Sequence, residues 1–227
     1  MRSLNTALNT ALSTPRRPSL PEASQVDLHV GRHAQRLVWH DHINQVNAPA
    51  AYAPWLTHRA SLTARLVAHS QRFRVQRLHQ GVAMCLPDEA RVIGLPRAQK
   101  VVARDVILRC DEQAVVYAHT VMPLSANATQ WPLFASLGEK SLGSTLFSDP
   151  LVQRGTLRFA RLSLTHPLMQ RIAQCGLLQG FMLAEQAQTF PQHLFARRSI
   201  FRRKGACLLV TEVFLPRIVT LRSAHTE

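Results

Sequence analysis

The sequence predicts an α+β domain built on an antiparallel β-sheet. Segments of alternating or β-branched residues come in neighbouring pairs joined by short turns, which is typical of β-hairpins. Helical patterns are interspersed among these hairpins, and the combination indicates an α+β arrangement. The length of 227 residues suits one domain whose interior can enclose a small ligand.

The N-terminal part gives weaker signals than the rest. Residues 1–25 contain an imperfect Leu-Asn-Thr-Ala repeat followed by Pro15, Pro18 and Pro21, and such a polar stretch has little to bury. We therefore expect a disordered extension over 1–25. Residues 26–53 have mixed polarity and several histidines, and their structure is left open.

A helix and a hairpin are expected in the first half. Ser61 is a good N-cap for a helix that carries Leu62, Leu66 and Val67 on one face. The predicted strands are 73–82, 101–109 and 114–122, and a turn at 111–113 joins the last two.

The second half continues in the same manner. A short helix is expected over 131–137, and a later helix is capped by Thr165, has Pro167 in its first turn and ends at Gly176. The predicted strands are 155–164, 196–203 and 207–215, with a turn on Lys204-Gly205 between the last two.

A formal net charge of +14 is the strongest compositional signal. It indicates attraction to polyanions or to an anionic small substrate. Nucleic acid is the less favoured partner, because the arginines are spread along the chain without a nucleic-acid-binding motif. The densest basic run, 197–204, is interpreted as a solvated strand and turn.

Composition also argues against several other classes of protein. No stretch approaches the roughly 18 apolar residues of a membrane span, and the N-terminus lacks the apolar core of a secretory signal, so a cytoplasmic protein is expected. The four cysteines form no C-x-x-C pair, and the eleven histidines lack the partners of a metal signature. We therefore expect reduced thiols and no metal site.

Two charged residues occupy strand faces that are otherwise apolar. Alternation places Glu212 with Val210, and Arg104 with Val106. A buried charge is costly unless it is paired or serves a ligand. Either Arg104 and Glu212 pair with each other, or they stand at opposite ends of a pocket made for a small polar acid. The pattern leaves both interpretations open.

A set of short motifs resembles the chorismate–pyruvate lyase family over Pro54 to Pro216. The motifs are, in order, Pro54-Trp55-Leu56, Ser61-Leu62-Thr63, 102–108 (VARDVIL), 118–123 (AHTVMP), 137–143 (LGEKSLG) with Leu146-Phe147, 196–199 (ARRS) and 208–216 (LLVTEVFLP). Their order and spacing carry the resemblance jointly. It implies a family domain over 54–217 and a C-terminal tail over 218–227.

The resemblance also implies an architecture and a site. The sheet would have about six antiparallel strands, with helical flaps over a buried ligand site. Arg104 would bind the ring carboxylate of substrate and product, and Glu212 would meet the ring hydroxyl at the opposite end. Leu62 and the backbone of Leu142 would complete the substrate-binding set. His119 departs from the family, where this position can be Arg, and its contact with a second carboxylate is left open.

The activity implied is conversion of chorismate to 4-hydroxybenzoate and pyruvate, an early step of ubiquinone biosynthesis, by a monomer that uses no cofactor. The reaction makes the ring aromatic, and the hydrogen can pass to the enolpyruvyl methylene within the substrate, so that the protein imposes the conformation. Arg104 and Glu212 are then the expected catalytic residues. A general-base role for Glu212 is the alternative.

A non-catalytic effector-binding module is the second interpretation. The ligand-sensing domains of GntR-type regulators resemble this fold, and a fold alone does not define an activity. The N-terminal region shows no helix-turn-helix pattern, which favours the enzyme.

Overall fold

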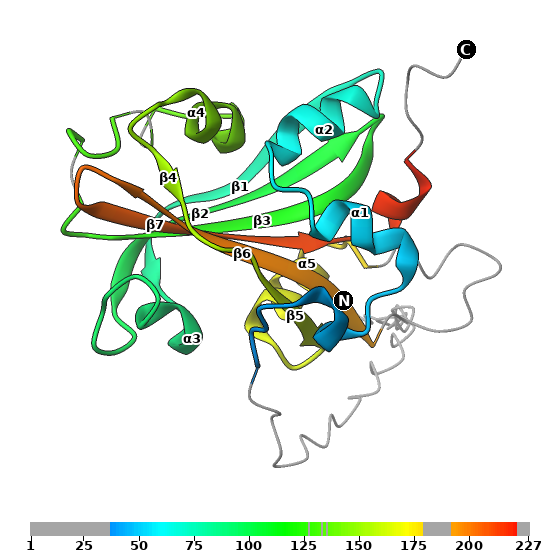
Figure 1. Ribbon diagram of the computed structural model, residues 1–227, viewed down its shortest axis with the longest axis horizontal. Helices are drawn as coiled ribbons and strands as arrows, with labels where there is room; N and C mark the ends of the chain where they lie inside the picture. Colours follow the sequence, from blue (N-terminus) through cyan, green and yellow to red (C-terminus); the bar gives the residue numbers. More distant parts are fainter. Residues whose placement is uncertain (1–36, 127, 133, 135, 179–191, 222–227) are drawn as a thin grey trace, which may run out of the picture. The chain divides into compact units, whose positions relative to one another are not determined.

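An antiparallel β-sheet organises the chain (Figure 1). The computed structural model describes residues 37–126, 128–132, 134, 136–178 and 192–221. All of these belong to one compact unit, residues 35–227. The expected extension over 1–25 lies outside the described residues.

In the described part of the chain the sheet has seven strands, in the order β1-β2-β3-β7-β6-β4, with β5 also paired to β6. The strands are β1 (Phe73–Met84), β2 (Lys100–Cys110), β3 (Gln113–Pro123), β4 (Gln153–Arg154), β5 (Arg158–Ser163), β6 (His193–Arg203) and β7 (Ala206–Phe214). The predicted strand 155–164 corresponds to β5, whereas β4 precedes it and was not predicted; both pair with successive parts of β6. The sheet is therefore six strands wide, which confirms the expected antiparallel α+β architecture.

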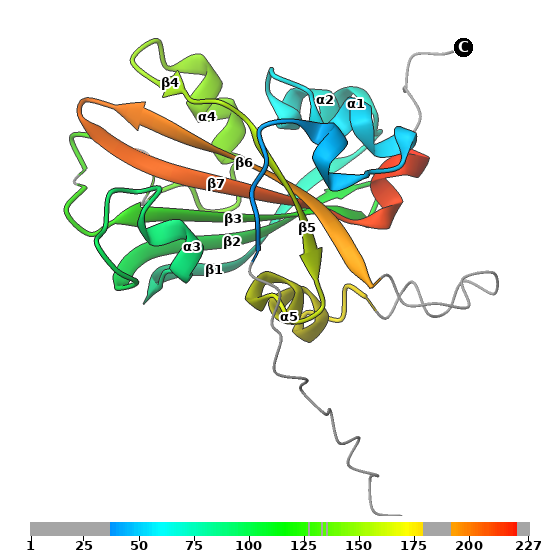
Figure 2. The same cartoon turned by 60° about the horizontal axis from the view of Figure 1, so that its bottom comes forward.

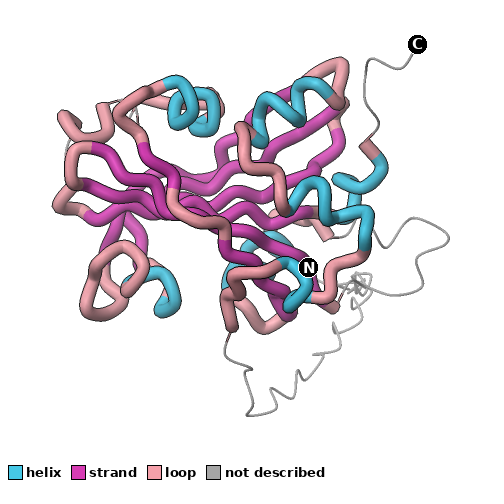
Figure 3. The backbone as a smooth tube through the Cα atoms, viewed as in Figure 1, coloured by secondary structure: helices cyan, strands magenta, loops and turns pink. Residues whose placement is uncertain are grey.

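Short helices cover both faces of this sheet (Figures 1 and 3). They are η1 (Ile43–Val46), η2 (Ala50–Tyr52), α1 (Ala53–Leu56), α2 (Leu62–Ala68), α3 (Pro87–Ala90), α4 (Leu142–Ser148), α5 (Pro167–Gln174) and η4 (Pro216–Thr220). Helices α2 and α4 lie over one face, and α3 and α5 lie over the other, as the two views in Figures 1 and 2 show. Both faces are consequently buried, as the apolar residues on both sides of the C-terminal strand predict.

Both predicted hairpin turns are confirmed. Asp111 and Glu112 have positive φ values of 48° and 66°, and Lys204 and Gly205 have values of 47° and 76°. Paired positive φ angles are the requirement of the tight turns whose twist matches that of a hairpin. Asp111 also accepts a hydrogen bond from the Arg72 N–H through Oδ1 at 2.8 Å, which fixes the first turn against the start of β1.

Two helix predictions need correction. The described residues of 131–137 lie in turns instead of a helix, and Trp131, Phe134 and Leu137 are buried together against the sheet. Tertiary packing, and not helical periodicity, explains their apolar character. The N-cap of α5 is His166, not Thr165, because the His166 ring nitrogen accepts from the Leu168 N–H at 3.2 Å.

Other details of the helices follow the sequence closely. The Ser61 hydroxyl accepts from the Ala64 N–H at 3.2 Å at the start of α2. Leu62 and Leu66 are buried as expected, but Val67 is half exposed, at 50%. Gly176, with φ of 69°, follows α5 as predicted.

The interpretation of the basic run 197–204 as a solvated strand and turn is wrong for its first two residues. Arg197 and Arg198 are only 1% and 8% exposed. Both are paired with acidic residues, Arg197 with Glu212 and Arg198 with Asp88. Alternation along β6 sends the two guanidinium groups to opposite faces of the sheet.

The flanking segments are attached to the sheet. His40, within the segment whose structure the sequence leaves open, pairs with Phe159 of β5 through two backbone hydrogen bonds of 2.8 Å. Ile218, within the tail expected over 218–227, is fully buried in η4 and belongs to the same cluster as Val46 and Trp55. Residues 222–227 lie outside the described part.

Candidate active site

A pocket lies between the sheet and the two helices α2 and α4. Its empty volume is about 580 Å³, with its open mouth included. The four residues expected at the site all line it: Leu62, Arg104, Leu142 and Glu212. The fold therefore brings together side chains that lie up to 150 positions apart in the sequence.

Arg104 enters the pocket from β2 as a buried cation. Only 2% of the residue is exposed. Its guanidinium donates to Gln80 Oε1 at 2.6 Å, to the Gly138 carbonyl at 2.9 Å and to the Lys140 carbonyl at 3.0 Å. Burial, with repulsion from Arg77 added, lowers its pKa. Among the described residues no carboxylate pairs with it, so its charge is available to an acidic ligand.

Glu212 enters the pocket from β7 and is paired with Arg197. Its Oε2 accepts from Arg197 Nε at 2.5 Å, and the Glu212 side chain keeps 15% of its surface exposed. Arg197 also donates to the carbonyls of Trp55 at 3.0 Å, Leu56 at 3.3 Å and His58 at 2.6 Å. The interpretation in which Arg104 and Glu212 pair with each other is thus wrong.

The two helices over the pocket meet at a close contact. Thr63 Oγ1 of α2 lies 2.5 Å from Ser141 Oγ, next to the start of α4. A Cβ atom at Gly143 would lie 2.7 Å from Thr63 Oγ1, so a larger residue would push the two segments apart. Thr63, Ser141 and Gly143 all line the pocket. The helices α2 and α4 are therefore the observed counterpart of the expected flaps.

Arg154 is a pocket residue that the sequence did not indicate. It reaches the pocket from β4, and its Nε donates to Ser199 Oγ at 2.9 Å. Burial lowers its pKa to about 10, opposed by the attraction of Glu212 and assisted by repulsion from Arg197 and Arg59. Arg154 thus stays protonated at neutral pH. A lone Arg before Gly155 in a two-residue strand has no periodic pattern that would have revealed it.

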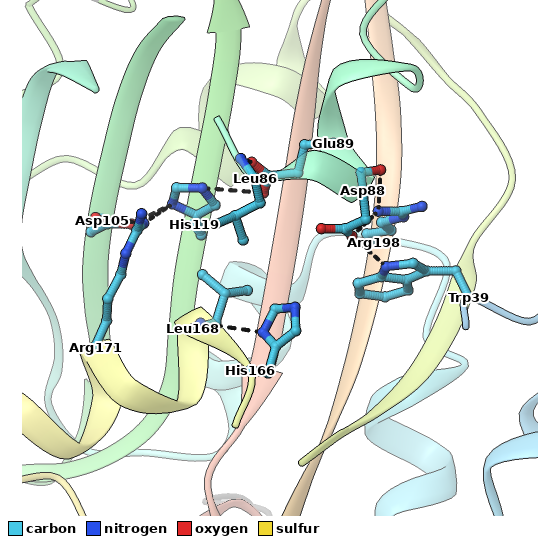
Figure 4. A network of polar contacts seen from close by, with 10 residues as sticks. All are labelled: Trp39, Leu86, Asp88, Glu89, Asp105, His119, His166, Leu168, Arg171 and Arg198. Atoms are coloured by element: carbon cyan, nitrogen blue, oxygen red, sulfur yellow. Dashed lines mark hydrogen bonds and ion pairs between the residues drawn. The ribbon is translucent and has the colours of Figure 1, made fainter. Parts of the chain in front are cut away.

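His119 lies on the face of the sheet opposite the pocket, because its neighbours Ala118 and Thr120 line the pocket. Figure 4 shows it beside Glu89 and Asp105. His119 is 1% exposed, with Nδ1 2.5 Å from Asp105 Oδ1. Its Nε2 is 3.2 Å from Glu89 Oε1, close enough for an ion pair but not aligned for a hydrogen bond. Arg171 adds a second cation, 3.6 Å from Asp105 Oδ2. The contact of His119 with substrate that was left open is therefore not supported.

The charges around His119 reverse the effect of its burial. Burial alone would lower the pKa of His119, but the neighbouring carboxylates of Asp105 and Glu89 raise it to about 9. Burial would likewise raise the pKa of Asp105, but His119 and Arg171 lower it. The histidine is thus a protonated member of an internal charge cluster.

The fold and the pocket define a domain that can bind a small molecule, and sequence comparison gives the family. A family described as "Chorismate lyase" matches residues 33–223. This chain belongs to the chorismate lyase family. The match extends beyond the expected domain of 54–217 at both ends, in agreement with the packing of His40 and Ile218.

Individual relatives agree with this assignment. A protein of Ralstonia nicotianae is 48% identical over 167 residues, covering 73% of this chain and 81% of the relative. One of Cupriavidus metallidurans is 42% identical over 186 residues, covering 82% and 83%. One of Nitrosomonas eutropha is 40% identical over 182 residues, covering 80% and 95%. All three bear the name "Probable chorismate pyruvate-lyase".

Two solved structures resemble part of this chain. The effector domain of PhnF from Mycobacterium smegmatis is 15% identical, with a TM-score of 0.47, covering 69% of this chain and 89% of that one. A GntR-family regulator from Bacillus cereus is 13% identical, with a TM-score of 0.44, covering 68% and 99%.

Within the described residues, no helix has the length and apolar character to cross a membrane.

Proposed function

We propose that this protein is a chorismate pyruvate-lyase that converts chorismate to 4-hydroxybenzoate and pyruvate. The observation that carries the proposal is the pocket, where Arg104 is a buried cation that no carboxylate of the described residues pairs with, and Glu212 presents a partly exposed carboxylate. Membership of the chorismate lyase family supports it. Arg104 binds the ring carboxylate, and Glu212 accepts a hydrogen bond from the ring hydroxyl.

The reaction needs no nucleophile from the protein. The bond between the ring carbon and the ether oxygen breaks, and the neighbouring ring carbon, which bears the hydroxyl, loses its hydrogen. That hydrogen moves to the enolpyruvyl methylene, which becomes the methyl group of pyruvate, while the ether oxygen becomes its keto oxygen. The ring becomes aromatic. The contribution of the site is to hold the enolpyruvyl arm over the hydrogen that it receives.

Apolar walls support this positioning role. Val106, Leu108 and Leu146 line the pocket together with Leu62 and Leu142. Such a lining excludes water and strengthens the electrostatic contacts of Arg104 and Glu212 with a bound ring. Because Glu212 is already held by Arg197, its orientation is fixed before substrate arrives.

The test is incubation of the purified protein with chorismate in the presence of a chelator. Equimolar 4-hydroxybenzoate and pyruvate are expected. Activity abolished by the chelator and restored by a divalent ion would contradict the cofactor-free reaction. Binding of chorismate without turnover would favour the effector-binding alternative, and salt-sensitive retention on nucleic acid would favour a polyanion-binding role.

We further propose that the enzyme acts as a cytoplasmic monomer and supplies the aromatic ring for ubiquinone. A pocket enclosed by elements of a single chain supports the monomer, because no second subunit is needed to complete its lining. Light scattering at micromolar concentration measures the mass directly. A strain that lacks this enzyme should regain ubiquinone when 4-hydroxybenzoate is added.

A further inference from the structure

We propose that Arg154, oriented by Ser199, binds the second carboxylate of the substrate, the one on the enolpyruvyl arm. This role rests on the proposed function and adds to it a residue that binds the dicarboxylate substrate more tightly than the monocarboxylate product. It is carried by the contacts of Arg154, by the charge balance of the pocket and by the order of the strands.

The contacts of Arg154 leave donors for a ligand. Its Nε donates to Ser199 Oγ at 2.9 Å and its Nη1 to the Arg59 carbonyl at 2.6 Å. The guanidinium carbon lies 5.3 Å from the ring centre of Phe147 and 5.5 Å from that of Phe201, so aromatic rings hold it in place. Both protein acceptors are neutral oxygens. Within the described part of the chain, no carboxylate forms an ion pair with Arg154.

The charge balance of the pocket matches a dianion. Its charged lining residues are Arg104, Arg154 and Glu212. Glu212 is compensated by Arg197, which stands behind it. Arg104 and Arg154 are then the two cations whose charges are not balanced by a direct pair. Arg104 is buried and Arg154 is partly buried. Because a cation withdrawn from water is costly unless it meets an anion, a ligand with two carboxylates is the complementary partner.

The strand order places these two cations at opposite ends of the pocket. Arg104 is on β2 and Arg154 on β4, with β3, β7 and β6 between them. Strands lie about 4.8 Å apart, so four steps separate the two backbones by roughly 19 Å. Both side chains line the same pocket, so they approach a bound ligand from opposite sides of it. Glu212, on β7, lies between them, where a ring hydroxyl next to the arm would be.

A comparison of substrate with product tests the proposal. Product carries only the ring carboxylate, so Arg154→Gln should lower kcat/KM for chorismate by about 10- to 100-fold, the loss for one charge-assisted contact. The same variant should change the dissociation constant of 4-hydroxybenzoate by less than about 3-fold. Arg104→Lys, in contrast, should weaken both ligands. Arg202→Gln, an exposed Arg next to Phe201 on β6, is the matched control and should change neither.

A second variant covers the case in which Arg154→Gln does not fold. Ser199→Ala removes the hydroxyl that orients Arg154 and should lower kcat/KM for chorismate by roughly 3- to 10-fold, with product affinity unchanged. Wild-type kcat/KM in a folded Arg154→Gln variant, or equal losses for substrate and product, would overturn the proposal. If the wild-type protein binds chorismate without converting it, the proposed function falls, and calorimetric affinities for chorismate and 4-hydroxybenzoate still decide the role of Arg154.

Discussion

Arg104 and His119 lie on neighbouring strands, yet the two faces of the sheet treat their charges differently. On the face covered by α3 and α5, His119 is enclosed by the carboxylates of Glu89 and Asp105. On the face covered by α2 and α4, the acceptors that Arg104 meets in the described part of the chain are all neutral. Buried charge therefore has two uses in this protein. Charges paired with each other belong to the packed interior, where removal of one partner is costly. A charge left unpaired can instead pair with a ligand.

The largest expected effect is on the paired face. Glu89→Gln should lower the free energy of unfolding by about 3–5 kcal/mol, because it removes one partner of a buried ion pair and weakens the acceptor for the Leu86 N–H, now at 2.8 Å. Denaturant unfolding measures this loss. The folded fraction should retain wild-type kcat/KM, and a folded variant with a specific loss of activity would show that the two faces are coupled.

The same cluster predicts a pH dependence of stability. The pKa of His119 is raised from 6.5 to about 9 in the folded protein. Its contribution is therefore fully present below pH 6.5 and is lost as the pH rises to about 9, a change on the order of 3 kcal/mol. Unfolding measured between pH 6 and 10 should show this decrease, and His119→Gln should flatten it. An equally steep decrease in the variant would assign the effect to other groups.

On the unpaired face the expected effect is on binding. Arg104→Lys should weaken chorismate and 4-hydroxybenzoate by about 100-fold, or ~2.7 kcal/mol, because Lys lacks the planar two-point contact with a carboxylate. The melting temperature should change little, since the charge is kept. Normal binding of both ligands by the folded variant would remove Arg104 from the site.

A smaller effect is expected at Glu212, which belongs to the pocket but is also paired. Glu212→Gln should lower turnover by about 10-fold if the residue positions the ring hydroxyl, and by roughly 10²–10⁴-fold if it is a general base. Arg197 keeps three backbone carbonyls as acceptors, which limits the loss of stability. We expect the first outcome. Near-complete loss of turnover with normal product affinity would establish the second.

The smallest effect is expected for the N-terminal segment. Deletion of residues 1–25, a polar and proline-punctuated stretch, should leave melting temperature and kcat/KM nearly unchanged. A large decrease in either would mean that this segment contributes to one of the two faces.

The sequence by itself determined the elements whose signals are local. Alternation located the strands and placed Glu212 and Arg104 on buried faces, the turn residues at Asp111-Glu112 and Lys204-Gly205 ended the hairpin strands, and Ser61 capped α2. The family motifs led to four of the residues that line the pocket. These features depend on neighbours within a few positions, or on motifs that are visible in the chain itself.

Only the tertiary structure decided which charges are partners. The pairing of Glu212 with Arg197 depends on the register of β6 against β7, and the approach of Arg154 depends on a two-residue strand at the edge of the sheet. Alternation of side chains along β3 places His119 on the opposite face of the sheet, and its pairing there depends on Glu89 from α3. Burial and partnership arise from long-range contacts, and a local pattern shows that a charge is buried but not what it meets.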